Sequence, residues 1–156
     1  MGIEIERKFL VTSDAWRAQA ETVTRFSQGY LSRDPARTVR VRIAGDQAFL
    51  TIKGKTTGAA RAEFEYPLPL ADAHELLAMS DGPVVEKHRH LCTVDGMTWE
   101  VDEFLGANAG LVVAEIELTS QTQAFTRPEW VGEEVTGQAR YVNANLAVHP
   151  FTEWHP

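Results

Sequence analysis

The sequence predicts an α+β fold, mainly antiparallel β, in which eight strands close into a barrel and helices pack on its outside. Two observations lead to this prediction. Charged residues recur at every second position in segment after segment, so that a strand gathers them on one face and leaves the other face apolar. Short connections join these segments, which favours antiparallel pairing, and about eight antiparallel strands can close on themselves. We expect one domain over 1–156, a length that can bury a true core.

The first strand is expected over 3–11. Its residues Glu4, Glu6 and Lys8 share one face, and Phe9 lies on the other. One such group is typical of any half-buried strand with a solvated face, so only its repetition is informative. The same-face charged pairs that follow are Arg40/Arg42, Lys53/Lys55, Glu63/Glu65, Lys87/Arg89, Glu100/Asp102 and Glu115/Glu117.

The remaining strands are separated by turn-rich stretches such as 32–36, 44–46 and 55–60. All of them except 26–33 carry a same-face charged pair, with apolar residues on the other face. These strands are expected over 26–33, 37–44, 47–55, 61–67, 84–91, 97–105 and 112–119.

Helices are expected between and after the strands. Ser13 or Asp14 can cap the first helix, and the second shows the apolar spacing of an amphipathic helix. The segment 128–137 shows no regular pattern and is expected to be irregular. The expected helices lie over 14–21, 70–79 and 143–148.

Composition narrows the function classes. The formal charge of −7 disfavours a nucleic-acid binder, which presents a basic face to phosphates. The single cysteine, Cys92, excludes an internal disulfide framework and a cysteine-based zinc cluster, and the charged N-terminus lacks the apolar region of a signal peptide. No apolar run is long enough to span a bilayer. We therefore expect a cytoplasmic protein that binds neither nucleic acid nor membrane.

The apolar strand faces, which include Val41, Ile52 and Ile116, need cover from helices or from a partner subunit, so a homodimer is one expectation. If these faces point outward, the charged faces line a polar tunnel. Buried charges must then pair, stay hydrated or bind ions of opposite sign. Arg and Lys match phosphate oxygens, whereas clustered carboxylates suit hard cations such as Mg²⁺ or Mn²⁺. A metal-bound polyphosphate uses both kinds of group.

Ordered motifs along the chain resemble those of one family. Glu4-Ile5-Glu6-Arg7-Lys8 fits an ExExK signature, Gln28-Gly29-Tyr30-Leu31 a second-strand motif and Val39-Arg40-Val41-Arg42 an RxR strand. ExExK alone is weak, but the ordered blocks at strand spacing together resemble CYTH-domain proteins of the triphosphate tunnel metalloenzyme superfamily over nearly the whole chain. The segment 130–136 resembles the inorganic tripolyphosphatase branch. Later matching blocks lie over 51–54, 63–65, 86–89, 99–104, 114–118 and 134–137, followed by Arg140-Tyr141.

The resemblance implies an enzyme that converts tripolyphosphate, or a nucleoside triphosphate, in a tunnel with Mg²⁺ or Mn²⁺; the expected products of tripolyphosphate are diphosphate and phosphate. Tyr30 or Lys87 would assist proton transfer if adjacent cations lower their pKa. Glu4, Glu6 and Glu117 would hold a first metal ion. The implied phosphate-binding residues are Lys8, Arg40, Arg42, Lys53, Lys55, Lys87, Arg89 and Arg140, although Lys55 fits a charge at a loop entry equally well. The acidic candidates for a second metal ion or a water molecule are Glu63, Glu65, Glu100, Asp102 and Glu115.

Three alternatives stay open. A thiamine-triphosphatase or a class IV adenylyl cyclase would share the tunnel but would need a pocket for the organic group, for which the sequence gives no signal. A non-catalytic polyphosphate-binding module would have lost metal-binding carboxylates, whereas Glu4, Glu6, Glu115 and Glu117 are all present. A lipocalin-like carrier needs an apolar lumen, which the charged pairs contradict.

Overall fold

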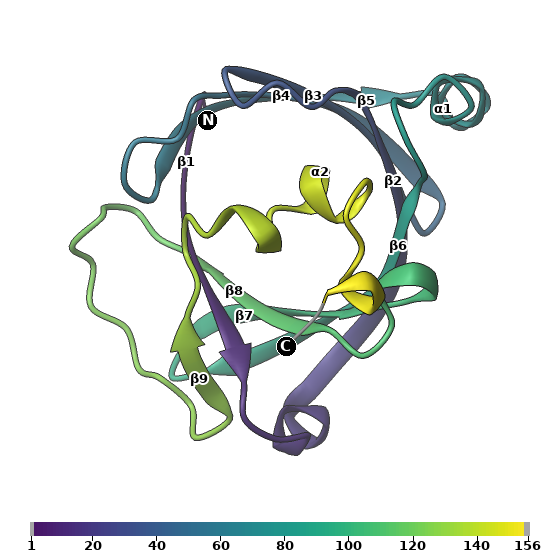
Figure 1. Ribbon diagram of the computed structural model, residues 1–156. Coiled ribbons are helices and arrows are strands. Elements are labelled where there is room, and N and C mark those ends of the chain that lie inside the picture. Colours follow the sequence, from purple (N-terminus) through teal and green to yellow (C-terminus); the bar gives the residue numbers. More distant parts are fainter. Residues whose placement is uncertain (1, 155–156) are drawn as a thin grey trace.

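The strands of this protein close into a barrel, which Figure 1 shows along its axis. In a computed structural model, which describes residues 2–154, nine strands form one sheet in the order β5-β4-β3-β2-β6-β7-β8-β1-β9, and a further β5–β1 pairing closes it. The neighbouring strands are antiparallel, which confirms the predicted fold class. The strands are β1 (Gly2–Val11), β2 (Ala20–Ser32), β3 (Arg37–Ala44), β4 (Gln47–Gly54), β5 (Ala60–Leu68), β6 (Val85–Val94), β7 (Met97–Phe104), β8 (Val112–Glu117) and β9 (Val131–Glu134).

Strand β1 closes the barrel because it pairs along both of its edges. Residues 2–5 pair with β5, and residues 6–10 pair with β8. The first strand of the sequence therefore contacts the middle and the end of the chain. Its alternation directs Glu4, Glu6 and Lys8 into the barrel, while Phe9 packs in an apolar cluster outside.

Strand β9 was not expected, because the sequence predicts that 128–137 is irregular. Residues 131–134 pair with the part of the β1 edge that lies beyond β5. Arg7 of β1 donates to Glu134 through both Nε (2.8 Å) and Nη2 (2.5 Å). Four residues are too short to show a strand alternation of their own, and the strand forms because an open sheet edge is available to it.

The start of β2 is a second difference. The sequence predicts a helix over 14–21 and a strand from 26, but only a 3₁₀ turn, η1 (Ala15–Gln19), forms before the strand begins at Ala20. The segment Thr22-Val23-Thr24 is β-branched throughout and therefore favours extended backbone. This extension pairs with β6, while the fully buried Trp16 of η1 packs against the barrel wall.

Two apolar layers cover the outside of the barrel. Helix α1 (Leu70–Leu77) lies on the outer face near β3 and β4, as expected, and buries Ala73 against Val41. The second layer collects around Trp99, whose ring lies 5.6 Å from that of Phe9 and 5.8 Å from that of Trp130. Because these layers cover the apolar strand faces, the charged faces point inward.

The C-terminal helix α2 (Asn143–Leu146) confirms the short helix expected over 143–148, but it does not lie outside. Figure 1 shows it within the ring of strands. Leu146 is fully buried against Val85, Phe104 and Val113, which point into the barrel because they continue the inward faces of β6, β7 and β8. An apolar inner surface at this end needs an apolar cover, and α2 supplies it. None of the helices within residues 2–154 has both the length and the apolar character needed to cross a membrane.

Replacement of Trp99 tests the outer layer around it. Trp99→Ala is expected to lower the free energy of unfolding by about 4 kcal/mol, because it removes a fully buried ring that contacts several others. Urea denaturation followed by circular dichroism measures this change. Val23→Ala, at a position that is 58% exposed, is the matched control and is expected to change stability by less than about 0.5 kcal/mol. Equal losses in the two variants would contradict the assignment of Trp99 to the core.

Candidate active site

The barrel encloses a cavity of about 430 Å³ that is lined mostly by charged side chains. Within residues 2–154, seven basic and seven acidic residues line it. They project inward because they occupy alternate positions of their strands, so the polar tunnel predicted from the sequence is present. The basic residues are Lys8, Arg40, Arg42, Lys53, Arg61, Lys87 and Arg89, and the acidic residues are Glu4, Glu6, Glu63, Glu65, Glu100, Glu115 and Glu117.

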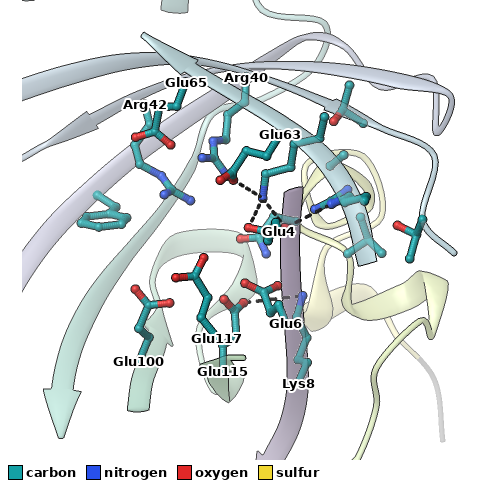
Figure 2. A pocket seen from close by; sticks show the side chains of 18 of the residues that line it. Glu4, Glu6, Lys8, Arg40, Arg42, Glu63, Glu65, Glu100, Glu115 and Glu117 are labelled. Carbon is teal, nitrogen blue, oxygen red and sulfur yellow. Dashed lines mark hydrogen bonds and ion pairs between the residues drawn. The ribbon is translucent and has the colours of Figure 1, made fainter. Parts of the chain in front are cut away.

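Carboxylates from β1, β7 and β8 form an acidic wall (Figure 2). The register of these strands places Glu6 opposite Glu117 and Glu100 opposite Glu115. Like charges that face each other across a strand pair destabilise a sheet. The lumen contains two groups of three carboxylates whose oxygens lie within 4.8 Å of one another. One group is Glu6, Glu100 and Glu115, and the other is Glu4, Glu63 and Glu117.

The acidic wall resists full ionisation. Burial raises the pKa of Glu6 well above its ordinary value of 4.5, and the Glu115 and Glu4 carboxylates raise it further. Burial likewise raises the pKa of Glu63, Glu100 and Glu117, again with help from neighbouring carboxylates. A cation bound between these groups would remove the repulsion. The donors are carboxylate oxygens only, which fit a hard divalent cation such as Mg²⁺ or Mn²⁺.

Arg40 and Arg42 of β3 form a basic wall on another side of the lumen (Figure 2). Neither has a carboxylate partner within 4.0 Å among residues 2–154. Arg40 is 7% exposed; one of its terminal nitrogens donates to Thr51 Oγ1 (3.2 Å), but its Nε has no partner in the described chain. Arg42 donates to the neutral Gln28 Oε1 (2.9 Å). Burial lowers the pKa of Arg42 to about 9, and the like charges of Arg40 and Arg89 contribute. One buried and one half-buried guanidinium group without a carboxylate partner could together bind an anion.

Lys53 and Glu4 connect the two walls. Lys53 Nζ donates to both oxygens of Glu4 (3.1 and 3.0 Å), and Arg61 Nε donates to Glu4 Oε1 (3.2 Å). Burial alone would raise the pKa of Glu4, but the charges of Lys53 and Arg61 and hydrogen bonds with Lys53 and Glu63 together lower it to about 2. Glu4 is therefore an anion at neutral pH and fixes the position of the Lys53 ammonium group.

Asp102 lies behind the cavity rather than in its lining, although the sequence makes it a metal-ligand candidate. It is fully buried and accepts hydrogen bonds from Lys87 Nζ (2.6 Å) and from Arg89 Nε (2.8 Å). These bonds occupy both of its oxygens. Burial lowers the pKa of Lys87 to about 7, even though Asp102 raises it. Asp102 therefore lies on the inward face of β7 but is covered by the two cations that it holds at the lumen wall.

Tyr30, the second proton-transfer candidate, lines the cavity close to Lys87. Gln28 Nε2 donates to Tyr30 Oη (3.3 Å) and to Asn143 Oδ1 (3.0 Å), and Lys87 Nζ donates to the same Asn143 oxygen (3.3 Å). Lys8 Nζ donates to the carbonyl oxygen of Tyr141 (3.1 Å). The C-terminal segment therefore contributes directly to the site.

The structure places two predicted substrate-binding residues outside the cavity. Lys55 is exposed beyond the end of β4 at Gly54, where the alternation stops. Arg140 is exposed, and its guanidinium stacks on the Trp154 ring at 4.0 Å. In contrast, the sequence reasoning missed Arg61, which is two residues before Glu63 on the same strand face and could have been found by extending that pattern.

Gln28 and Asn143 were also missed as site residues. Gln28 belongs to a motif noted in the sequence, but a neutral side chain gives no charge signal. Asn143 reaches the lumen only through the position of α2, which no local pattern predicts.

A closed antiparallel barrel with opposed basic and acidic walls defines a class of proteins that hold a small charged ligand within a tunnel. The chain belongs to the CYTH-domain family, whose model matches residues 2–149. This result confirms the family resemblance drawn from the motifs.

Relatives of known name cover almost the whole chain. An inorganic triphosphatase from Acetivibrio thermocellus is 48% identical over 152 residues, covering 97% of each chain. An inorganic triphosphatase from Nitrosomonas europaea is 36% identical over 150 residues, covering 93% of this chain and 97% of the relative. A crystal structure of an inorganic triphosphatase matches with a TM-score of 0.67 at 35% identity, covering 93% of this chain and 94% of that one.

Ionisation of Glu6 is expected to destabilise the metal-free protein. The pKa of Glu6 is higher in the folded protein than in the unfolded protein. The stability that the protonated side chain contributes is therefore fully present below the unfolded pKa of 4.5, and it is lost as the pH rises through the folded pKa. Urea denaturation in EDTA between pH 4.5 and 7 measures the free energy of unfolding of the wild type and of Glu6→Gln. As the pH rises over this range, the stability of the variant relative to the wild type is expected to increase by about 1 kcal/mol or more.

Excess Mg²⁺ at pH 7 is expected to stabilise the wild type more than the Glu6→Gln variant, because the ion binds the ionised carboxylate and favours the folded state. Parallel pH profiles of the two proteins in EDTA would contradict the raised pKa. Equal stabilisation by Mg²⁺ would contradict a place for Glu6 at the cation.

Proposed function

We propose that this protein hydrolyses inorganic tripolyphosphate to diphosphate and phosphate in the barrel lumen, with Mg²⁺ or Mn²⁺. The observation that carries the proposal is the arginine pair of β3, buried Arg40 and half-buried Arg42, which lack carboxylate partners within residues 2–154 and share the cavity with clustered carboxylates. A metal-bound polyphosphate complements both walls at once. The names of the two relatives, inorganic triphosphatase in each case, support the same reaction.

The basic residues would bind and orient the phosphate chain. An arginine guanidinium can donate to two phosphate oxygens in a fixed fork, and Arg40 and Arg42 are adjacent on the inward face of β3. Lys8 and Lys53 are held at defined places by Tyr141 and Glu4. Phosphoryl transfer depends mainly on such positioning and on neutralisation of the phosphate charge.

The acidic residues would hold the divalent cation. Glu6, Glu100 and Glu115 form one candidate site, and Glu4, Glu63 and Glu117 form another. A bound cation would neutralise phosphate charge as a Lewis acid. Both groups contain ion-paired carboxylates: Lys53 and Arg61 pair with Glu4, whereas Arg89 pairs with Glu100 and with Glu115. We assign the first ion to the group around Glu6, because Glu6 itself has no ion-pair partner within residues 2–154 and its pKa is raised well above the ordinary value.

Lys87 would move a proton at its Nζ atom. Its pKa of about 7 allows both protonation states near neutral pH, and its ammonium group lies in the lumen wall beside the phosphate-binding arginines. Tyr30, joined to it through Gln28 and Asn143, would hold the position of a water molecule or a phosphate oxygen with its hydroxyl group.

The outer surface supports a homodimer as a second part of the proposal. Ile3, Phe64 and Tyr66 are 67%, 48% and 54% exposed, and they belong to the paired strands β1 and β5. Exposed apolar residues grouped on one face often mark an interface. If this face mediates a dimer, analytical sedimentation is expected to show a dimer for the wild type and a monomer for Phe64→Glu.

Substrate profiling tests the proposed reaction. Phosphate release is measured from tripolyphosphate, ATP, thiamine triphosphate and diphosphate with Mg²⁺, Mn²⁺ or EDTA. Tripolyphosphate with a metal ion is expected to react fastest, and EDTA is expected to abolish turnover. Tight binding of tripolyphosphate without turnover would indicate a binding module instead, and formation of cyclic AMP from ATP would indicate a cyclase.

A pair of arginines on one strand tests the basic wall. Arg40→Ala is expected to lower kcat/KM for tripolyphosphate by about a hundredfold, which corresponds to about 2.7 kcal/mol of lost transition-state binding. Arg37 lies on the same strand, but its side chain is 71% exposed and pairs with Asp34, so Arg37→Ala is expected to stay within about twofold of the wild type. Similar losses in both variants would contradict the assignment.

A further inference from the structure

Phe26 lies among the cations of the lumen. It is 8% exposed and lines the same cavity. Three basic groups lie over its ring: Arg42 Cζ at 4.6 Å from the ring centre, Arg89 Cζ at 4.9 Å and Lys87 Nζ at 5.7 Å. A cation within about 6 Å of an aromatic ring face is attracted by the negative charge density of that face.

The strand register brings these side chains together. Strand β2 lies between β3 and β6, and Phe26 pairs with Ala44 on one side and with Lys87 on the other. Arg42 and Arg89 are its diagonal neighbours, two residues along from those partners. Diagonal neighbours in a sheet lie within reach of aromatic and long side chains. Contact between the ring and all three cations is therefore a consequence of the barrel's pairing.

These cations differ in their anionic partners. Lys87 and Arg89 share Asp102, and Arg89 also pairs with Glu100. Arg42 has no such partner in the described chain and is repelled by its basic neighbours. A carboxylate near Arg42 would relieve that repulsion, but it would also repel a phosphate chain. An aromatic ring attracts cations and carries no net charge.

We propose that Phe26 is a positioning residue, which holds Arg42, Lys87 and Arg89 in the arrangement that receives the phosphate chain. This inference rests on the proposed function. The ring lowers the repulsion among the three cations and, unlike a carboxylate, does not occupy the terminal N–H groups of Arg42, whose only side-chain hydrogen bond within residues 2–154 is from Nε to Gln28. Phe26 acts through the cations and makes no bond to the reacting atoms.

The test must distinguish the effect of the ring's electron density from the effect of its volume, because any apolar group of that size would fill the same space. Replacement of Phe26 by 3,4,5-trifluorophenylalanine keeps the shape and withdraws electron density from the ring face. Phe49 provides a matched control: it lines the same cavity from β4, and no cation within residues 2–154 lies over its ring. The same replacement at Phe49 alters the lumen's fluorine content equally.

Steady-state kinetics with tripolyphosphate and saturating Mg²⁺ give KM and kcat for each protein. The trifluoro variant at position 26 is expected to raise KM about fivefold and Phe26→Leu about tenfold, with smaller changes in kcat, because the variants loosen the groups that bind substrate. The trifluoro variant at position 49 is expected to stay within about twofold of the wild type.

An unchanged KM in the trifluoro variant at position 26, or an equal rise at position 49, would overturn the role of Phe26. Failure of Phe26→Leu to fold, seen by circular dichroism, leaves the shape-preserving variant to decide. An inactive wild type would overturn the proposed function itself, which distinguishes the two failures.

Discussion

The burial of many charges in one lumen is the constraint on which the rest of this structure depends. Outer layers around Trp99 and beneath α1 cover the apolar strand faces, so the alternation of each strand directs its charged residues inward. The register then decides which charges meet. It places carboxylates of β1, β7 and β8 side by side and keeps Arg40 next to Arg42 on β3. The barrel thus holds clusters of like charge, positive in one place and negative in another, which an apolar core would not contain.

The charged residues divide into those that the protein itself neutralises and those that it leaves for a ligand. Glu4 fixes Lys53, and Asp102 fixes Lys87 and Arg89. Arg40, Arg42 and Glu6 have no ion-pair partner of opposite charge within residues 2–154. Unpaired charge in the lumen costs stability, and a ligand that carries both a cation and phosphates would recover this free energy on binding. The unfavourable electrostatics of the lumen and the proposed affinity for such a ligand would therefore have the same origin.

Local alternation explains how much of the site could be predicted from the sequence. Residues such as Glu6, Arg40 and Glu115 were placed in the lumen because a period of two needs no knowledge of the rest of the fold. Lys55 and Arg140 lie outside it, because the first follows the end of a strand and the second belongs to a 3₁₀ turn, η3 (Ala139–Tyr141), where strand alternation does not apply. Asn143 depends on the path of α2 into the barrel, and β9 depends on an open edge of β1. Both are properties of the assembled barrel that no short segment encodes.

Helix α2 contributes both to the apolar core and to the site. Leu146 completes the apolar core at one end of the barrel, while Asn143, less than one helical turn earlier, accepts hydrogen bonds from Lys87 and Gln28. An insertion or deletion between Gly137 and Asn143 would displace both side chains together. Changes of substrate range through this segment would therefore carry a folding penalty, and variation is better tolerated at the rim of the barrel. The end of the chain is in this sense a constraint on the evolution of the lumen.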